Sequence, residues 1–175
     1  MLRIFALTFL AFCLSLQLQA NELDRVRKSF HNAVLNKTQI AVFQSLSDSL
    51  PIDVPVFQAY KAVAQALQAQ EKWNPLDKLA HLLKFQNQIS EAIKSDPTNL
   101  EIRFLRFCVE YNIPSWLSMN QHLIEDKDHF ISHAEQIVDL KFDPFFSRYI
   151  LYFIKETGLC SEEDTRIIFS KLAMK

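Results

Sequence analysis

Apolar side chains recur every three or four positions along most of the chain, which is the spacing of one face of an α-helix. Leu23, Val26, Phe30 and Val34 predict a helix over about 22–35, with Asn21 as its N-cap. The same spacing predicts further helices over about 38–48, 56–73, 75–95, 98–111, 121–138 and 144–157, and from 161 onward. Sustained alternation of apolar and polar residues, the mark of a half-buried strand, is missing. We therefore predict an all-α fold of about seven or eight helices in antiparallel pairs, forming one domain over 21–175.

Prolines, one glycine and capping residues mark the ends of these helices. Pro51 and Pro55 predict an extended or turning segment. Asn74 and Pro75 form an N-cap and first-turn pair. The helix that they open is expected to bury Leu79, Leu82, Phe85, Ile89, Ala92 and Ile93. Gly158 is the expected left-handed residue at a C-terminus, and Ser161 with Asp164 forms a capping box for the last helix.

The N-terminal segment has the layout of a secretory signal peptide. Arg3 precedes an apolar run over 4–16, and the polar segment NELDR follows Ala20. We predict a signal peptide over 1–20, although Leu18 is larger than the residue preferred near a cleavage site; a retained anchor helix is the alternative. The apolar run is short for a membrane span. The mature protein is therefore expected in the periplasm or outside the cell, with no membrane span after cleavage.

Composition removes several classes of function. The chain has 175 residues but a single glycine, so the glycine-rich loops that hold phosphates in nucleotide-binding proteins are absent. Its formal net charge is -1, without the clustered basic residues that nucleic acid requires. We expect neither nucleic-acid binding nor a cofactor.

The segment EIRFLRF places two arginines in an otherwise apolar helix. At about 100° per residue, Arg103, Arg106 and Glu110 share one narrow polar stripe. The arginines could clamp an anionic ligand, because a guanidinium group suits carboxylate and phosphate. They could instead belong to an ion-pair network with Glu110 and with Asp126 or Asp128 of the following helix. A charged stripe on a buried helix needs such partners, which favours the network.

A second candidate site lies in the segment EDKDHFISH. Glu125, His129 and His133 are spaced four residues apart and share one face of the predicted helix. Zinc or copper could use ligands placed in this way. The alternative is an exposed border of an amphipathic helix.

Two cysteines remain beyond the signal segment. Cys108 and Cys160 could form a disulfide in an oxidising compartment. Alternatively, Cys108 is a free thiol that packs on an apolar face.

The segment AIKSDPTN, residues 92–99, is similar to the junction between tetratricopeptide repeats, and AYKAVAQALQ before it has similar small residues. This resemblance around residues 57–111 implies stacked helical pairs. The run PTNLEIRFLRFCVEYNIPSWL followed by EDKDHFI resembles small exported helical proteins of bacteria. That likeness implies a bacterial envelope setting.

Three functions are consistent with the sequence. The first is a non-enzymatic module that binds another envelope protein or a peptide through a helical groove. The second is a metal-binding protein or small hydrolase that uses the face of Glu125, His129 and His133. The third is a structural domain without a ligand of its own.

Overall fold

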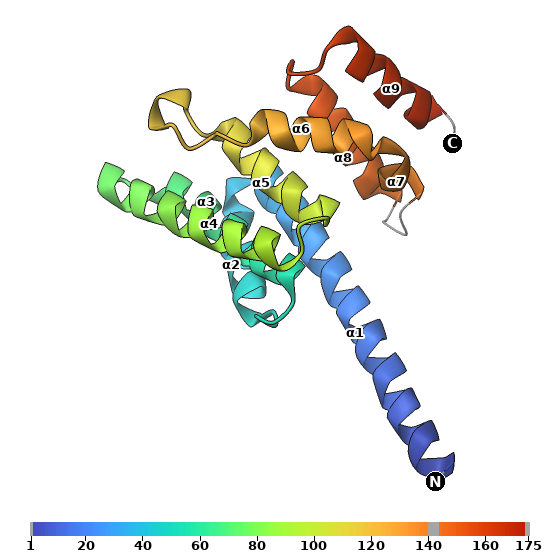
Figure 1. Cartoon of the computed structure of the whole chain (residues 1–175). Coiled ribbons are helices and arrows are strands. Elements are labelled where there is room, and N and C mark those ends of the chain that lie inside the picture. The colour runs from blue at the N-terminus through green and yellow to red at the C-terminus, as the bar shows by residue number, and fades with distance from the viewer. Residues whose placement is uncertain (1, 140–143, 174–175) are drawn as a thin grey trace. The chain divides into compact units, whose positions relative to one another are not determined.

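A computed structural model describes the backbone of residues 2–139 and 144–173, and the side chains of residues 17, 19–137 and 146–171. Over the described backbone the chain forms nine α-helices and two short 3-10 helices, without a strand (Figure 1). Neighbouring helices pack in antiparallel-like pairs. The predicted all-α fold is therefore confirmed.

The chain divides into two compact units, Met1–Ser95 and Asp96–Lys175. Each of them contains its own set of packed helices. The proposal of one domain over 21–175 remains a prediction.

The first unit consists of α-helices joined by short connections. Its described elements are α1 (Leu2–Leu35), the 3-10 helix η1 (Lys37–Gln39), α2 (Ile40–Ser49), α3 (Pro55–Glu71) and α4 (Pro75–Ser95). Pro55 occupies the first turn of α3, where its missing N–H is not needed. Asn74 accepts a hydrogen bond from the backbone N–H of Leu76, so the predicted cap of α4 is present.

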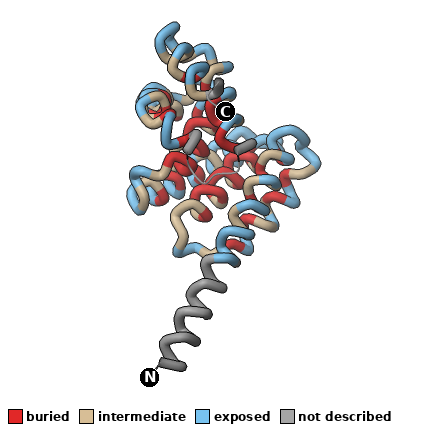
Figure 2. Tube along the Cα trace, turned by 90° about the vertical axis from the view of Figure 1, so that its right-hand side faces the viewer, coloured by how far each residue is buried: buried red, intermediate tan, exposed pale blue. Residues whose placement is uncertain are grey.

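The core of the first unit combines aromatic rings with small residues. Phe30, Phe43 and Tyr60 pack with ring centroids 5.9 to 6.4 Å apart and come from α1, α2 and α3. Helix α3 packs against both α2 and α4. Its buried alanines allow this close approach on two sides: Ala59, Ala62, Ala64, Ala66 and Ala69. Figure 2 shows the resulting alternation of buried and exposed positions along the helices.

The second unit is also built from helices alone over its described backbone. These are α5 (Leu100–Asn112), the 3-10 helix η2 (Ser115–Leu117), α6 (Leu123–Ser132), α7 (Ala134–Asp139), α8 (Pro144–Glu156) and α9 (Glu162–Ala173). Helix α5 packs against α6, and α9 contacts α6, α7 and α8. Gly158 follows α8 with a φ of +72°, the left-handed conformation that its position predicts.

The core of the second unit is built around Phe104 on α5. Its ring lies 5.8 to 6.3 Å, centroid to centroid, from Phe130 of α6 and from Phe146, Tyr149 and Phe153 of α8. All four contacts are edge-to-face, the arrangement that aromatic rings prefer. The abundance of phenylalanine in the sequence thus supplies the contacts between α5, α6 and α8.

Three local predictions are wrong. Asn21 lies inside α1 rather than at its start. The helix expected over 121–138 is two helices, because His133 has torsions (φ -112°, ψ 18°) outside the helical region. This break accounts for nine α-helices over the described backbone where we expected seven or eight. Leu79, expected in the core of α4, is 37% exposed, whereas Phe85, Ile89 and Ala92 are buried as predicted.

The signal-peptide prediction falls largely on side chains outside the described set, which omits residues 1–16 and 18. Within the part of the chain whose side chains are described, we find no helix that is both long and apolar enough to cross a membrane.

Candidate functional site

The two arginines of EIRFLRF lie on α5, opposite the first turn of α6. The side chain of Asn99 caps α5 by accepting from the N–H groups of Glu101 and Ile102. Arg103 and Arg106 follow one turn apart and therefore point to the same side. Glu125 and Asp126 stand in the first turn of α6, where the positive end of the helix dipole favours carboxylates.

Asp126 is the centre of this group. Arg106 donates from Nε to one carboxylate oxygen at 2.7 Å and from Nη2 to the other at 2.6 Å, a two-pronged contact. Arg103 donates to Asp126 from Nη1 at 2.9 Å. The side chain of Asp126 is fully buried, and Arg106 is only 6% exposed.

Glu125 forms the outer edge of the group. It accepts from Arg103 at 2.8 Å and from Arg106 at 3.4 Å, and its side chain is 57% exposed. Arg103 also donates from Nε to the carbonyl of Pro97 at 3.0 Å. The guanidinium groups of both arginines are thus directed at oxygen atoms of the second unit itself.

The pKa shifts agree with this geometry. Burial disfavours the charged form of Arg106, but the hydrogen bonds and charge of Asp126 outweigh it, and the pKa of the guanidinium is raised. The hydrogen bond from Arg103 lowers the pKa of Glu125. The pairing with Asp126 that the sequence suggested is confirmed, and the contacts are those of the ion-pair network.

A related contact was missed by the sequence analysis. Glu110, on the same stripe of α5 and 2% exposed, acts on Arg106 only through its charge. It accepts a hydrogen bond from the backbone N–H of His122 at 2.9 Å. The His122 ring nitrogen Nδ1 lies 2.7 Å from the other carboxylate oxygen. This contact fixes the residue that precedes α6. Only the polar stripe itself could have indicated that Glu110 needed a partner.

The three residues of the proposed metal site do not share a common contact. Glu125 is paired with both arginines. The rings of His129 and His133 lie with their centroids 4.2 Å apart and their planes tilted by 32°. Nδ1 of His133 lies 2.8 Å from the carbonyl oxygen of His129, while the buried Nε2 of His129 makes no hydrogen bond to the described residues. Among the side chains that the structure describes, three or more potential metal ligands do not gather at any point.

Cys108 and Cys160 are both free thiols in this structure. Both contribute to the apolar core of the second unit, Cys108 as a buried member and Cys160 at its edge. Burial raises the pKa of each thiol, that of Cys108 strongly. Since the thiolate is the reactive form, neither environment activates a nucleophile. The disulfide stays a prediction.

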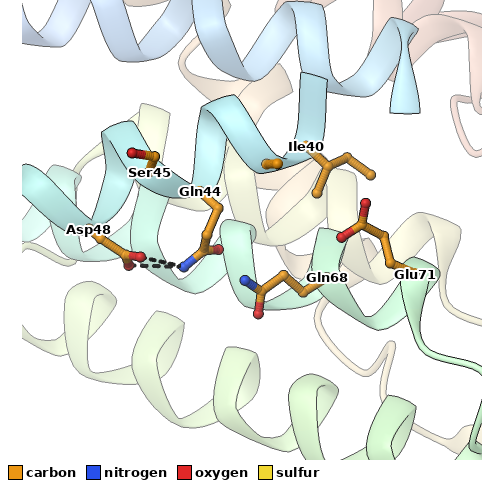
Figure 3. A pocket seen from close by; sticks show the side chains of 7 residues that line it. Ile40, Gln44, Ser45, Asp48, Gln68 and Glu71 are labelled. Atoms are coloured by element: carbon orange, nitrogen blue, oxygen red, sulfur yellow. Dashed lines mark hydrogen bonds between the residues drawn. The ribbon is translucent and has the colours of Figure 1, made fainter. Parts of the chain in front are cut away.

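The first unit has a pocket of about 360 Å³ between α2 and α3. Figure 3 shows Gln68 of α3 across from Gln44 of α2, and Glu71 of α3 across from Ile40. The Gln44 amide nitrogen donates to both oxygens of Asp48 at 2.9 Å, and its buried carbonyl oxygen makes no hydrogen bond within the described part of the chain. The lining is rich in acceptors, with Ile40 and Ala41 as its apolar part.

A second surface feature of the first unit follows the N-terminal half of α4. Leu76, Leu79 and Leu83 are 73%, 37% and 48% exposed and have the i, i+3, i+7 spacing of one helix face. Trp73, 98% exposed, lies two residues before the start of this helix. We call these four residues the α4 strip. The sequence analysis assigned Leu79 to the core because periodicity does not reveal which apolar side meets a neighbour.

Comparisons with known protein families, curated proteins and solved structures found no match to this chain.

Proposed function

We propose that this chain is an exported, non-enzymatic module that binds another protein through the α4 strip. The exposure of Leu76, Leu79 and Leu83 on one face of α4, with the exposed Trp73 two residues before the helix, carries the proposal. Clusters of exposed apolar side chains are typical of interaction sites, whereas single ones are common everywhere. A helix face with this spacing can receive a helix or a peptide from a partner.

The chemistry-bearing residues support a binding role over an enzymatic one. Arg103 and Arg106 are paired with Glu125 and Asp126. The alternative function, a metal-binding protein or hydrolase that uses Glu125, His129 and His133, would require Glu125 to leave two arginines. Those two cations would also oppose a metal ion nearby.

The exported setting rests on the signal-peptide pattern over 1–20. Among the described side chains of α1, the buried ones are Val26, Phe30 and Ala33, all beyond Ala20. Cleavage after Ala20 would therefore leave these core contacts of α1 intact. We expect the mature protein in the envelope or medium fraction to begin at Asn21, by intact-mass measurement. Recovery of only the uncleaved chain would contradict the cleavage.

The binding role is tested by photo-crosslinking in the native cells. A photoreactive phenylalanine derivative at position 79 should give a specific adduct with one identifiable protein. The control is position 88, because Gln88 is exposed on α4 but lies about 140° around the helix from Leu83. The Leu83→Glu substitution should remove the adduct, and the purified partner should bind the purified chain. Equal adducts from positions 79 and 88, or none from either, would contradict the proposed function.

A further inference from the structure

The pocket between α2 and α3 carries a carboxylate at each of its two ends. Ile40, Gln44 and Asp48 are spaced four residues apart, so they follow one face of α2 over about 12 Å of helix axis, at about 1.5 Å per residue. Figure 3 shows Glu71 of α3 across from Ile40, at the end away from Asp48. The pocket is therefore elongated, with two separated anionic groups, and we call it the α2–α3 groove.

Neither of these carboxylates has a cationic partner in the described part of the chain. The Asp48 carboxylate accepts from the amide nitrogen of Gln44, at 2.9 Å to each oxygen, while Glu71 makes no hydrogen bond or ion pair with a described residue. Lys61 donates to the backbone carbonyl of Asp48 at 3.1 Å, and Lys72 follows Glu71 in the chain without pairing with it. Both carboxylates are exposed and so are open to a ligand.

Beside the carboxylates the groove offers neutral acceptors and a small apolar part. Gln44 and Gln68 lie across from each other, and Ile40 and Ala41 are the apolar residues. The carbonyl oxygen of Gln44 is buried without a hydrogen bond from a described residue, and a donor from a ligand would relieve that cost. Because three potential metal ligands do not gather at any point among the described side chains, the lining does not fit a single metal ion.

We infer that the α2–α3 groove binds a linear aliphatic polyamine, for which the triamine spermidine is the model. One terminal ammonium pairs with Asp48 and the other with Glu71. The methylene chain lies along Ile40 and Ala41, and the central ammonium donates to the Gln44 carbonyl oxygen. This site is separate from the α4 strip, so the inference goes beyond the proposed function and does not rest on it.

The dimensions of the groove agree with this ligand. The terminal nitrogens of extended spermidine are nine bonds apart, as far as three extended residues reach, or roughly 10–11 Å. The two ends of the groove have a similar separation along α2. The volume of about 360 Å³ lies within the usual range of ligand pockets, about 300–1,000 Å³.

The distance between the two charges selects among cations. An exposed ion pair is weak by itself, so binding requires that one ligand engage both carboxylates. A monoamine reaches one carboxylate, and a short diamine cannot span both. The ammonium groups of Lys61 and Lys72 oppose cations that do not make both contacts, and the two carboxylates repel anions.

Isothermal titration calorimetry of the purified chain, at about 0.15 M salt, tests the inference. We expect spermidine to bind at least tenfold more tightly than the shorter diamine putrescine, and butylamine to give no measurable binding. In nuclear magnetic resonance spectra, spermidine should shift the side-chain amide signals of Gln44 and Gln68, which line the groove.

Matched variants locate the binding. Asp48→Asn and Glu71→Gln keep the shape of the side chain and remove one charge, so each should weaken spermidine binding at least fivefold. Asp77→Asn is the control, because Asp77 is an exposed acid of α4 outside the groove and its replacement changes the net charge equally. Both groove carboxylates are exposed, so these variants should fold as the wild type does, which circular dichroism checks.

Each contrary outcome overturns the inference. Absent binding, or equal affinity for spermidine and putrescine, would show that the two carboxylates do not act together on one ligand. An equal loss in Asp77→Asn would assign the binding to diffuse attraction between a polycation and an acidic surface. A lysine-rich peptide that binds in place of spermidine, and is lost in Glu71→Gln, would assign the groove to a protein partner. The photo-crosslink at position 79 is independent of these results, so their failure leaves the proposed function standing.

Discussion

At the scale of single residues, Asp126 has the most demanding environment among the described side chains of the second unit. A fully buried carboxylate is costly unless it is paired and hydrogen-bonded, and Asp126 receives three donors from two guanidinium groups. The pairing joins α5 to the first turn of α6. A buried charge pair adds little net stability compared with apolar residues, but removing one partner is expensive because the other charge remains buried.

Asp126→Ala should therefore lower the free energy of unfolding by about 3–5 kcal/mol, since it leaves Arg106 buried without its main partner. Glu125→Ala should cost less than about 1 kcal/mol, because Glu125 is 57% exposed. Urea unfolding of both variants measures the difference. In the Asp126→Ala background, Arg106→Ala should cost much less than it does in the wild type. Equal losses for Asp126→Ala and Glu125→Ala would show that burial does not decide the energetics here.

A second prediction at this scale concerns pH and His129. Burial, followed by the charges of Arg103 and His133, lowers the pKa of His129 below its ordinary value of 6.5. The unfolded chain then binds a proton more readily than the folded one below about pH 6.5. Stability is complete above that pH and is lost as the pH falls through the folded pKa, by at most about 1.4 kcal/mol per pH unit for one proton.

His129→Leu should accordingly lose less stability between pH 7.5 and pH 5.5 than the wild type, as measured by urea unfolding at both pH values. Some dependence should remain, because burial also lowers the pKa of His81. Glu125 affects the stability in a different pH range. Its pKa is lowered from 4.5, so the stability that its charged form contributes is lost only at more acidic pH. Parallel pH profiles for the variant and the wild type would contradict the role of His129.

At the scale of elements, the start of α9 combines a local cap with a long-range tie. The Ser161 hydroxyl accepts from the N–H of Asp164 at 3.1 Å, and the Asp164 carboxylate accepts from the N–H of Ser161 at 2.9 Å. The same carboxylate oxygen accepts from Lys127 of α6 at 2.9 Å. These hydrogen bonds, the backbone one first, lower the pKa of Asp164.

We expect Ser161→Ala to cost about 1 kcal/mol, the usual cost of losing an N-cap. Asp164→Ala should cost more, because it removes the other half of the box and also the contact with Lys127. Thermal unfolding shows which of the two variants loses more stability. Faster hydrogen exchange of the α9 amides would show that the loss is located in this helix. If Ser161→Ala is the more damaging change, the link from α9 to α6 contributes nothing measurable.

The sequence could predict those features of the helices that depend only on neighbouring residues. The capping box at Ser161, the left-handed Gly158 and the proline-initiated α4 are local, so neighbouring residues determine them. The contact of Lys127 with Asp164 joins residues 37 positions apart and had no local signal. The break at His133 also escaped prediction, because the apolar spacing continues through Ala134 and Ile137, which are both buried.

In the candidate sites, too, local features were predicted from the sequence and long-range contacts were not. Helical periodicity placed Arg103 and Arg106 on one face, but only the packing of α5 on α6 shows that Asp126 is their shared, fully buried acceptor. On α4, periodicity identified the apolar positions but not that Leu79 is left exposed while Phe85 is covered. Which apolar face lacks a neighbour is a tertiary property, and the α4 strip could be found only from the structure.

At the scale of the whole molecule, each compact unit has its own aromatic core. In the first unit Phe30, Phe43 and Tyr60 are in mutual contact. The apolar cluster around Phe104 draws its buried members from positions 100 to 168, all within the second unit. Ion pairs of Asp126 with Arg106 and of Asp164 with Lys127 also lie inside that unit. These contacts are the ones that an independently folding segment requires.

The segment Asp96–Lys175, expressed alone, should therefore fold. We expect helical far-ultraviolet circular dichroism, a near-ultraviolet signal from packed aromatic rings, and one cooperative thermal transition. About 80 residues give a small core, so its stability should lie near the lower end for natural domains. Phe104→Ala should cost about 3–5 kcal/mol in the segment and in the full chain alike, because its ring contacts are retained in both. A segment that is helical but lacks the near-ultraviolet signal and a cooperative transition would mean that the Phe104 core does not form a fixed structure without the first 95 residues.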